Sequence, residues 1–240
     1  MSGHNKWSKI KNKKGSEDAK KGKIFTKHAR NITVAAKEGG VNPEYNPALK
    51  TAIEKAKADN MPNDNIDRAI KKAAGDDASD NFERIIYEGY GPGGVAIIVD
   101  CLTDNKNRTA PDVRHAFDKN GGNLGTDGSV MFMFDRKGDI IINSEGKDFD
   151  EFMMDALEAG CEDVKDMGEY FEAITDVQTF NDANDNLKEA GYKVESADIS
   201  YLAQNLIKVD DEDQKSKLTK LIDTLEDNDD VQEVYSNWDY

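Results

Sequence analysis

Lysines crowd the start of the chain in a pattern that could bind phosphate. Within the first thirty residues ten side chains are cationic, against only Glu17 and Asp18. The ten are Lys6, Lys9, Lys11, Lys13, Lys14, Lys20, Lys21, Lys23, Lys27 and Arg30. Cations at this density neutralise phosphates and release condensed counterions, which gives affinity for nucleic acid with little sequence discrimination. Trp7 lies among them and could stack on an unpaired base; alternatively, its indole holds the basic segment against the helices that follow.

Two loops farther along the chain form a possible second contact with nucleic acid. Residues 105–108 and 121–128 are rich in Asn and Gly, and Arg108 and Arg114 lie in or near the first of them. Turn geometry and helix N-capping explain the same residues. We favour the turn-and-cap interpretation.

Residues that would support catalysis or metal binding are not arranged for either. Gly89–Gly94 matches a dinucleotide-binding fingerprint, but the motif leads into the apolar run Val95–Val99 and not into a helix, so a hairpin turn is expected. His4, His28 and His115 have no carboxylate or cysteine at ligand spacing. We interpret His28 and His115 as partly buried helix residues. The sequence therefore predicts a non-enzymatic protein without a metal or cofactor.

Three amphipathic helices are expected to follow the basic segment. The first begins after Ser16, carries an apolar stripe at helical spacing and ends at Gly39. The second begins with Asn46 as cap and Pro47 as first residue, and the third ends at Gly75. Each is too short to be stable alone, so the three are expected to form one small helical domain.

The spacing of the apolar residues changes after an acidic linker, residues 76–81. Residues 83–89 and 95–100 predict a β-hairpin, since both are rich in β-branched and aromatic side chains. Residues 107–120 predict a helix and residues 129–134 a strand. This part alone makes an incomplete α/β domain.

A regular unit then follows, and the end of the chain has no partner of its own. From residue 138 to residue 200 the order strand, helix, strand, strand, helix, strand indicates a ferredoxin-like domain. A helix over residues 214–225 and a strand over residues 231–235 cannot bury their own apolar faces. They are expected to return to the sheet that begins near residue 83. The sequence thus predicts an α+β protein with three domains: 1–75 helical, 82–135 plus 207–240 α/β, and 136–206 a ferredoxin-like α/β domain inserted in the second.

Charge is divided unevenly along the chain. Through Gly75 the sequence holds 17 Lys and Arg against 8 Asp and Glu, the remainder holds 15 against 40, and the net charge is −16. Because the Debye length is about 8 Å in physiological salt, a basic end can bind phosphate although the molecule is anionic. The same sequence carries no signal for a membrane or for secretion. Its apolar runs are shorter than the ~20 residues that span a bilayer, and its lysine-rich start lacks the apolar core of a secretory signal. Cys101 and Cys161 lack CxxC partners, which is typical of a reducing compartment. We therefore expect a cytoplasmic protein.

Six motifs, spread over most of the chain, are long enough to be specific. They are Gly3-His-Asn-Lys-Trp-Ser-Lys-Ile-Lys, Gly22-Lys-Ile-Phe-Thr-Lys, Glu88-Gly-Tyr-Gly-Pro-Gly-Gly, Asp104-Asn-Lys-Asn-Arg-Thr, Val113-Arg-His-Ala-Phe and Gly121-Gly-Asn-Leu-Gly-Thr-Asp-Gly-Ser-Val. Together they closely resemble the YebC/PmpR family, and the similarity covers essentially the whole chain. The resemblance implies a helical N-terminal domain followed by two α/β domains, one inserted in the other.

The resemblance leaves two regulatory functions open. It implies either a probable transcriptional regulator that binds promoter DNA, as bacterial members are usually described, or a protein that acts at the ribosome, like a mitochondrial relative that activates translation of a cytochrome oxidase subunit. Reading duplex DNA calls for Arg, Asn or Gln directed at base edges, whereas a lysine-rich arm with one tryptophan suits structured RNA. We expect a DNA-binding transcriptional regulatory protein. The alternatives are a ribosome-associated translation factor that contacts rRNA or tRNA, and a protein-interaction adaptor; neither a membrane nor a small-molecule substrate is expected as a partner.

Overall fold

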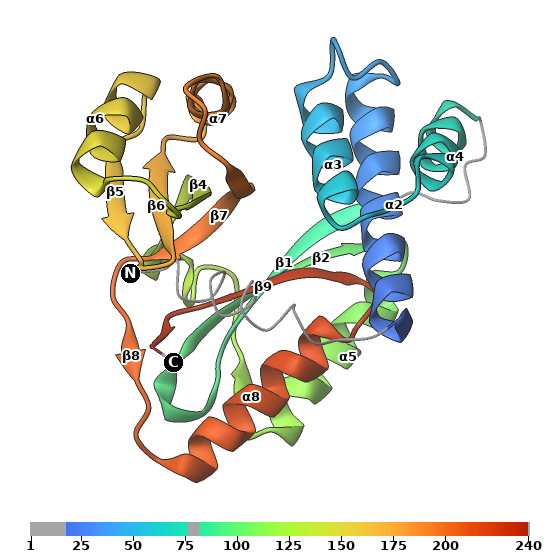
Figure 1. Cartoon of the computed structure of the whole chain (residues 1–240). Helices are drawn as coiled ribbons and strands as arrows, with labels where there is room; N and C mark the ends of the chain where they lie inside the picture. Colours follow the sequence, from blue (N-terminus) through green and yellow to red (C-terminus); the bar gives the residue numbers. More distant parts are fainter. Residues whose placement is uncertain (1–17, 76–81, 240) are drawn as a thin grey trace. The chain divides into compact units, whose positions relative to one another are not determined.

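The computed structural model describes residues 18–75 and 82–239, with only the backbone described for residues 18–21 (Figure 1). Helices and antiparallel sheets alternate along the chain, which confirms the predicted α+β class. By their contacts the described residues form two compact units, one of residues 18–131 with 207–239 and the other of residues 132–206. Within the described ranges no helix has the length and apolar character needed to cross a membrane.

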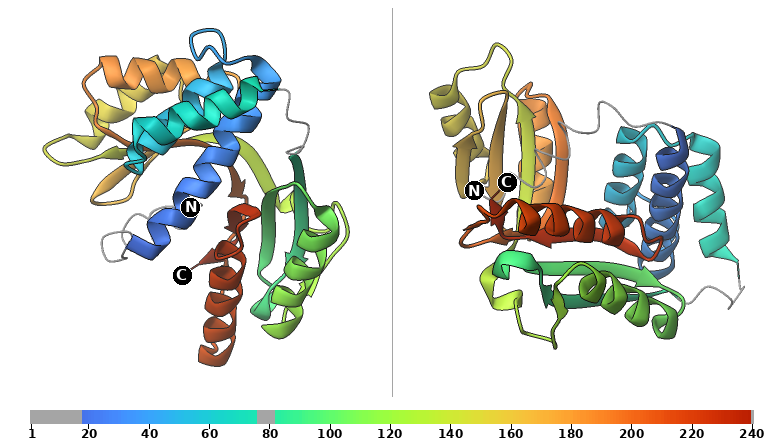
Figure 2. Two further views of the ribbon diagram at one scale, coloured as in Figure 1. Left: turned by 90° about the vertical axis from the view of Figure 1, so that its right-hand side faces the viewer. Right: turned by 90° about the horizontal axis from the view of Figure 1, so that it is seen from below.

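The first unit begins with three helices, which Figure 2 shows side by side. They are α2 (Asp18–Gly39), α3 (Pro47–Ala58) and α4 (Asn63–Ala74). Ile32 of α2, Leu49 of α3 and Ile66 of α4 lie in their shared core. The predicted cap of α3 is confirmed, because the Asn46 side chain accepts a hydrogen bond from the backbone N–H of Leu49 at 3.0 Å. The N-terminal cap expected at Ser16 lies outside the described residues.

A four-stranded sheet follows in the same unit, with strand order β3-β1-β2-β9. Its strands are β1 (Glu83–Tyr90), β2 (Ala96–Thr103), β3 (Asn123–Leu124) and β9 (Val231–Ser236). β1 and β2 form the predicted hairpin around the turn η2 (Pro92–Gly94), and β9 pairs antiparallel with β2. The chain therefore returns to complete this sheet, as the sequence predicts.

Two helices bury the apolar side of this sheet. They are α5 (Lys106–Lys119) and α8 (Glu212–Glu226). Phe117 of α5 and Leu218 and Leu221 of α8 are fully buried in one cluster with strand residues such as Ile97. A short parallel pair, β8 (Ile207–Lys208) and β10 (Trp238–Asp239), was not predicted.

The strand predicted over residues 129–134 is wrong. The structure has a 3₁₀ turn, η3 (Met131–Met133), before the next strand begins at residue 134. Glu88 of β1 explains the difference, because its buried carboxylate accepts hydrogen bonds from the backbone N–H groups of Gly128, Val130 and Met131 at 2.7–2.8 Å. Donors held by this side chain do not join a sheet ladder.

The second unit, residues 132–206, has the predicted ferredoxin-like order. Its elements are β4 (Phe134–Asn143), α6 (Phe149–Ala159), β5 (Asp163–Asp166), β6 (Tyr170–Thr175), α7 (Phe180–Glu189) and β7 (Val194–Ala203). The strands pair antiparallel in the order β5-β6-β4-β7, the arrangement of a split βαβ sheet. Phe152 of α6, Leu187 of α7 and Phe171 of β6 fill the core between helices and sheet.

Candidate nucleic-acid interface

Most of the residues predicted to contact nucleic acid lie where side chains are not described. Those outside the described residues altogether are Lys6, Trp7, Lys9, Lys11, Lys13 and Lys14. Lys20 and Lys21 lie in the first turn of α2, of which only the backbone is described. Of the ten cations near the start of the chain, the contacts of Lys23, Lys27 and Arg30 can therefore be compared with the prediction.

Lys23, Lys27 and Arg30 lie on one side of α2, since residues three and four apart share a helix face. The Lys23 ammonium donates to the backbone carbonyl and the carboxylate of Asp227, both at 3.2 Å. Lys27 donates to the carbonyl of Glu226 at 2.7 Å, and Arg30 to the carbonyl of Asp229 at 2.7 Å. These acceptors lie at or just beyond the C-terminus of α8, where the helix dipole favours cations. The three side chains thus tie the helical domain to the end of α8, and their binding to phosphate stays a prediction.

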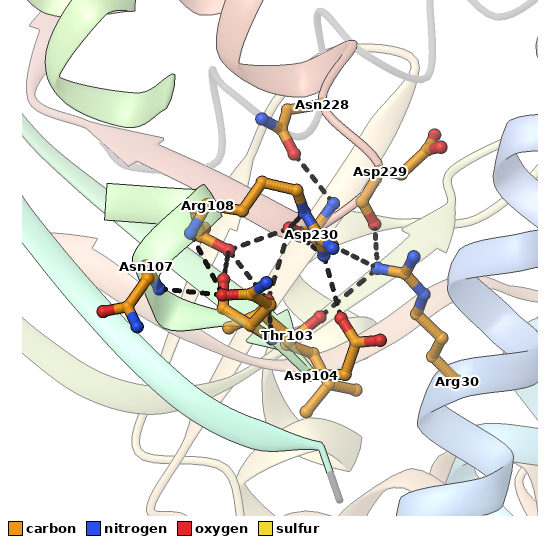
Figure 3. Close-up of polar contacts among 11 residues, drawn as sticks. Arg30, Thr103, Asp104, Asn107, Arg108, Asn228, Asp229 and Asp230 are labelled. Atoms are coloured by element: carbon orange, nitrogen blue, oxygen red, sulfur yellow. Dashed lines mark hydrogen bonds and ion pairs between the residues drawn. The ribbon is translucent and has the colours of Figure 1, made fainter. Parts of the chain in front are cut away.

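Asp230, immediately before β9, is the centre of a polar network drawn in Figure 3. The residue is only 3 % exposed. Arg30 Nη1 lies 2.8 Å from one carboxylate oxygen, and Arg108 Nη2 lies 2.8 Å from the other. The hydroxyl of Thr109 donates to this second oxygen at 2.8 Å, and that of Thr103 at 3.3 Å. One buried carboxylate therefore joins α2, β2 and α5.

The network decides the charge state of Asp230. Burial raises the pKa of this carboxyl, but the hydrogen bonds from Arg108, Thr109 and Arg30 outweigh burial and hold the pKa below its ordinary value. Asp230 is consequently ionised at neutral pH, with two guanidinium groups as its counter-charges.

Arg108 and its motif, residues 104–109, have a structural task that accounts for them. Besides Asp230, Arg108 Nη2 contacts the carboxylate of Asp104 at 2.9 Å. The side chain of Asn105 caps α5 by accepting from the backbone N–H of the two residues at positions 107 and 108. The turn-and-cap interpretation explains this loop, and a contact of Arg108 with nucleic acid stays a prediction. Arg114 is exposed and has no hydrogen bond or ion pair with any residue in the described part of the chain.

The second loop, residues 121–128, is also shaped by close packing. Gly121 and Gly128 have positive φ angles of 76° and 79°, a conformation that favours glycine. A Cβ atom at Gly122 would lie 2.7 Å from the carbonyl oxygen of Tyr90. Glycine is therefore required here by the backbone, with or without a ligand.

Cations on α3 and α4 were not singled out in the sequence. Lys57, Arg68 and Lys71 are exposed, and their side chains form no hydrogen bond or ion pair with another described residue. Arg68 and Lys71 are three residues apart and so share one side of α4. The signal that could have found them is their place on the polar faces of two amphipathic helices in the basic part of the sequence.

A groove of about 650 Å³ lies between α3 and α4. Lys50 and Lys57 of α3 and Asp67 of α4 are among its lining residues, together with the loop residue Pro43. Tyr45 belongs to this same loop and is 83 % exposed. The helical domain thus presents an exposed aromatic ring, Tyr45, as well as the exposed cations Lys57, Arg68 and Lys71.

Comparison with known families decides where the chain belongs. A family model described as the TACO1/YebC protein N-terminal domain matches residues 5–76, and one described as the TACO1/YebC second and third domain matches residues 82–238. The chain belongs to the TACO1/YebC family. The two matches are separated by the acidic linker.

Several relatives of this TACO1/YebC chain are named probable transcriptional regulatory proteins. The one from Finegoldia magna is 62 % identical, with 100 % of this chain and 99 % of the relative covered. The one from Clostridioides difficile is 58 % identical, covering 96 % of this chain and 97 % of the relative. The crystal structure of a conserved hypothetical protein from Aquifex aeolicus is similar with a TM-score of 0.85 and 45 % identity, covering 92 % of this chain and 91 % of that one.

The histidines of this TACO1/YebC chain differ in placement. His28 is partly buried, as predicted, and its Nε2 hydrogen-bonds with Asp59 Oδ2 at 2.7 Å, which links α2 to the end of α3. The prediction that His115 is partly buried is wrong, because this residue is exposed. Val113 and Phe117 occupy the inner side of α5, and position 115 lies on the opposite side of the helix.

Proposed function

We propose that this protein is a non-enzymatic regulator of gene expression that binds nucleic acid through its N-terminal helical domain. The observation that carries the proposal is the set of outer cations, Lys57, Arg68 and Lys71, which are exposed and have no counter-charge in contact with them among the described residues. Phosphates would supply that counter-charge, and the displaced counterions would supply the driving force. The lysine-rich segment before residue 18 adds further cations to the same domain.

In this proposal the cations of the helical domain divide into two groups. Lys23, Lys27 and Arg30 position the helical domain by binding the end of α8. The outer cations and the lysines of the N-terminal segment contact phosphate. An anionic ligand bound to the outer cations would therefore not compete for the three side chains that hold the end of α8.

Promoter DNA is the first candidate ligand, because the relatives are named transcriptional regulators. Structured RNA, as found in ribosomes, is the second candidate, and Tyr45 is the observation that favours it. A ring that is 83 % exposed can stack on an unpaired base, which contributes about 1–3 kcal/mol per base. Unpaired bases are typical of RNA loops and absent from intact duplex DNA.

The salt dependence of binding tests the proposal. Fluorescence anisotropy would measure the affinity of the full chain for a short DNA duplex and for an RNA stem-loop, each at several salt concentrations. In the variant K57Q/R68Q/K71Q the slope of log K against log salt should fall by about 2–3 for the duplex, since each lost contact removes about 0.9. The matched control K119Q/K217Q/K220Q removes three exposed lysines from the second domain and should leave the slope unchanged.

Substitution of Tyr45 and the affinities of the wild-type chain distinguish DNA from RNA as the ligand. Tyr45→Ser should weaken binding to the stem-loop about tenfold and binding to the duplex hardly at all, if RNA is the ligand. An equal effect of Tyr45→Ser on both ligands would exclude the RNA candidate. Binding of the wild-type chain to neither ligand, or equal slopes for the K57Q/R68Q/K71Q variant and its control, would overturn the proposal.

A further inference from the structure

The outer side of α6 carries an apolar cluster that the inserted domain does not use for its own core. Met153 is 37 % exposed, Met154 65 % and Leu157 54 %. Positions three and four apart share a helix face, so Leu157 lies beside both methionines. The inner side of the helix is occupied by Phe152 and Ala156, which are fully buried. The core of the domain is thus formed without the exposed side chains of Met153, Met154 and Leu157.

Carboxylates flank this cluster on the same helix. Asp150 lies four residues before Met154, and Glu158 lies four residues after it, so acidic groups stand on both sides of the exposed methionine along the helix. Within the ranges that the structure describes, neither Asp150 nor Glu158 takes part in an ion pair or a side-chain hydrogen bond. Among the described residues these two carboxylates thus have no partner of opposite charge in contact with them.

The inserted domain as a whole is also negatively charged. Residues 132–206 contain 19 Asp and Glu against 6 Lys and Arg, a net charge of −13. α7 packs beside α6 and adds exposed carboxylates, including Asp182 and Glu189. A ligand for this surface must tolerate a dense negative field.

Charge complementarity selects the occupant. Nucleic acid and anionic membrane surfaces are repelled by this domain. A symmetric pair of copies of this face would bring Asp150 and Glu158 against their own equivalents, which opposes that contact. A helix with an apolar stripe and lysines or arginines beside it satisfies both the apolar cluster and the carboxylates. Methionine suits such a surface because its flexible, polarizable side chain adapts to different partners.

We propose that the outer face of α6 is a docking site for a lysine- or arginine-rich amphipathic helix of a partner protein. The apolar side chains of that helix pack on Met154 and Leu157, and its cations pair with Asp150 and Glu158. The site would allow a nucleic-acid-bound protein to hold a basic protein at the same time. It is independent of the proposed function, because it uses a different unit of the chain and a different sign of charge.

The test uses a synthetic peptide as the probe. Isothermal titration calorimetry would measure binding of the full chain to a helical peptide of leucine and lysine with its leucines on one face, and to a scrambled peptide of equal composition whose leucines share no face. The amphipathic peptide should bind at least tenfold more tightly than the scrambled one. The variant M154S/L157S should remove that preference, and circular dichroism would verify that the exposed substitutions leave the fold unchanged.

A second variant tests the electrostatic half of the site. D150N/E158Q should weaken binding of the amphipathic peptide severalfold and lower its salt dependence. The matched control D112N/D118N removes two exposed carboxylates from α5, and it should bind the peptide like the wild type.

Three outcomes would overturn the proposal. Equal binding of both peptides would show attraction by charge alone. Unchanged peptide binding in both M154S/L157S and D150N/E158Q would place the peptide elsewhere. Sedimentation in which M154S/L157S dissociates a dimer of the wild-type chain would make a second copy the occupant of the face.

Discussion

The carboxylate of Asp230 and the carboxylates on the outer side of α6 differ in their burial and in their hydrogen-bond partners. Asp230 is 3 % exposed and accepts hydrogen bonds from two arginines and two threonines. Asp150 and Glu158 of α6 are exposed and have no such partner within the described residues. A buried charge requires compensation inside the protein, whereas water compensates an exposed one at little cost. The first arrangement therefore serves the fold, and the second leaves charge available to another molecule.

The cations of the helical domain divide in the same way. Arg30 has a side chain that is 19 % exposed and is committed to Asp230 and its neighbours. Lys57, Arg68 and Lys71 are committed to no other described residue. The number of cations in a segment is therefore a poor measure of how many can bind phosphate.

The largest effect is expected from removing the charge at the centre of the network. Asp230→Asn should lower the free energy of unfolding by about 2–4 kcal/mol, because it leaves Arg30 and Arg108 without a buried counter-charge. Urea denaturation followed by tryptophan fluorescence would measure the change.

The neighbouring position offers a matched control for this variant. Asp229 is exposed, and only its backbone carbonyl takes part in the network, as Figure 3 shows. Asp229→Asn removes the same charge one residue away and should change the free energy of unfolding by less than about 0.5 kcal/mol. Similar losses in the two variants would mean that net charge, and not the compensated carboxylate, sets stability here.

A smaller effect is expected on acidification. Burial raises the pKa of Glu88, but hydrogen bonds from the backbone N–H groups of Val130, Gly128 and Met131 hold it below its ordinary value of 4.5, and Asp230 is likewise held below 3.8. Both groups bind protons more weakly in the folded state than in the unfolded state. Their stabilisation is therefore complete above about pH 5 and is lost as the pH falls through the folded-state pKa values.

Denaturation at a series of pH values would measure this loss. Each unit by which a pKa is lowered contributes about 1.4 kcal/mol. The dependence of stability on pH below 5 should be shallower in Glu88→Gln and Asp230→Asn than in the wild-type chain. An unchanged dependence in both variants would show that other carboxylates govern acid unfolding.

The fold was largely predictable because most helices and strands are indicated by the residues within and next to them. α6 and β6 begin and end where the sequence predicts, since the apolar spacing of α6 is bounded by the cap Asp148 and by Gly160 in a left-handed conformation. The error at residues 129–134 has a distant cause. Glu88 is about forty residues away along the chain, and no local pattern shows that its carboxylate holds those N–H groups.

The candidate site was less predictable for the same reason. A lysine or arginine in the sequence is a cation, but the sequence does not show which carboxylates or carbonyl groups contact it in the folded protein. Arg30 meets Asp230 across a sequence separation of 200 residues. Lys57 and Arg68 were overlooked because they are dispersed along amphipathic helices and do not form a run.

The smallest effect is expected at the two cysteines, one in each of the contrasted regions. Burial, with the nearby charges of Asp100 and Asp230, raises the pKa of Cys101 to about 12. Burial raises the pKa of Cys161, which lies just after α6, to about 11.

Only the thiolate attacks a disulfide reagent, so both thiols should react slowly with Ellman's reagent at neutral pH and rapidly in urea. In the folded chain Cys161 should react faster than Cys101, because its pKa is raised less and a larger fraction of it is thiolate. Single Cys→Ala variants would assign the two rates, and a faster Cys101 would show that the Asp230 region opens more readily than the α6 region, contrary to the contrast drawn between them.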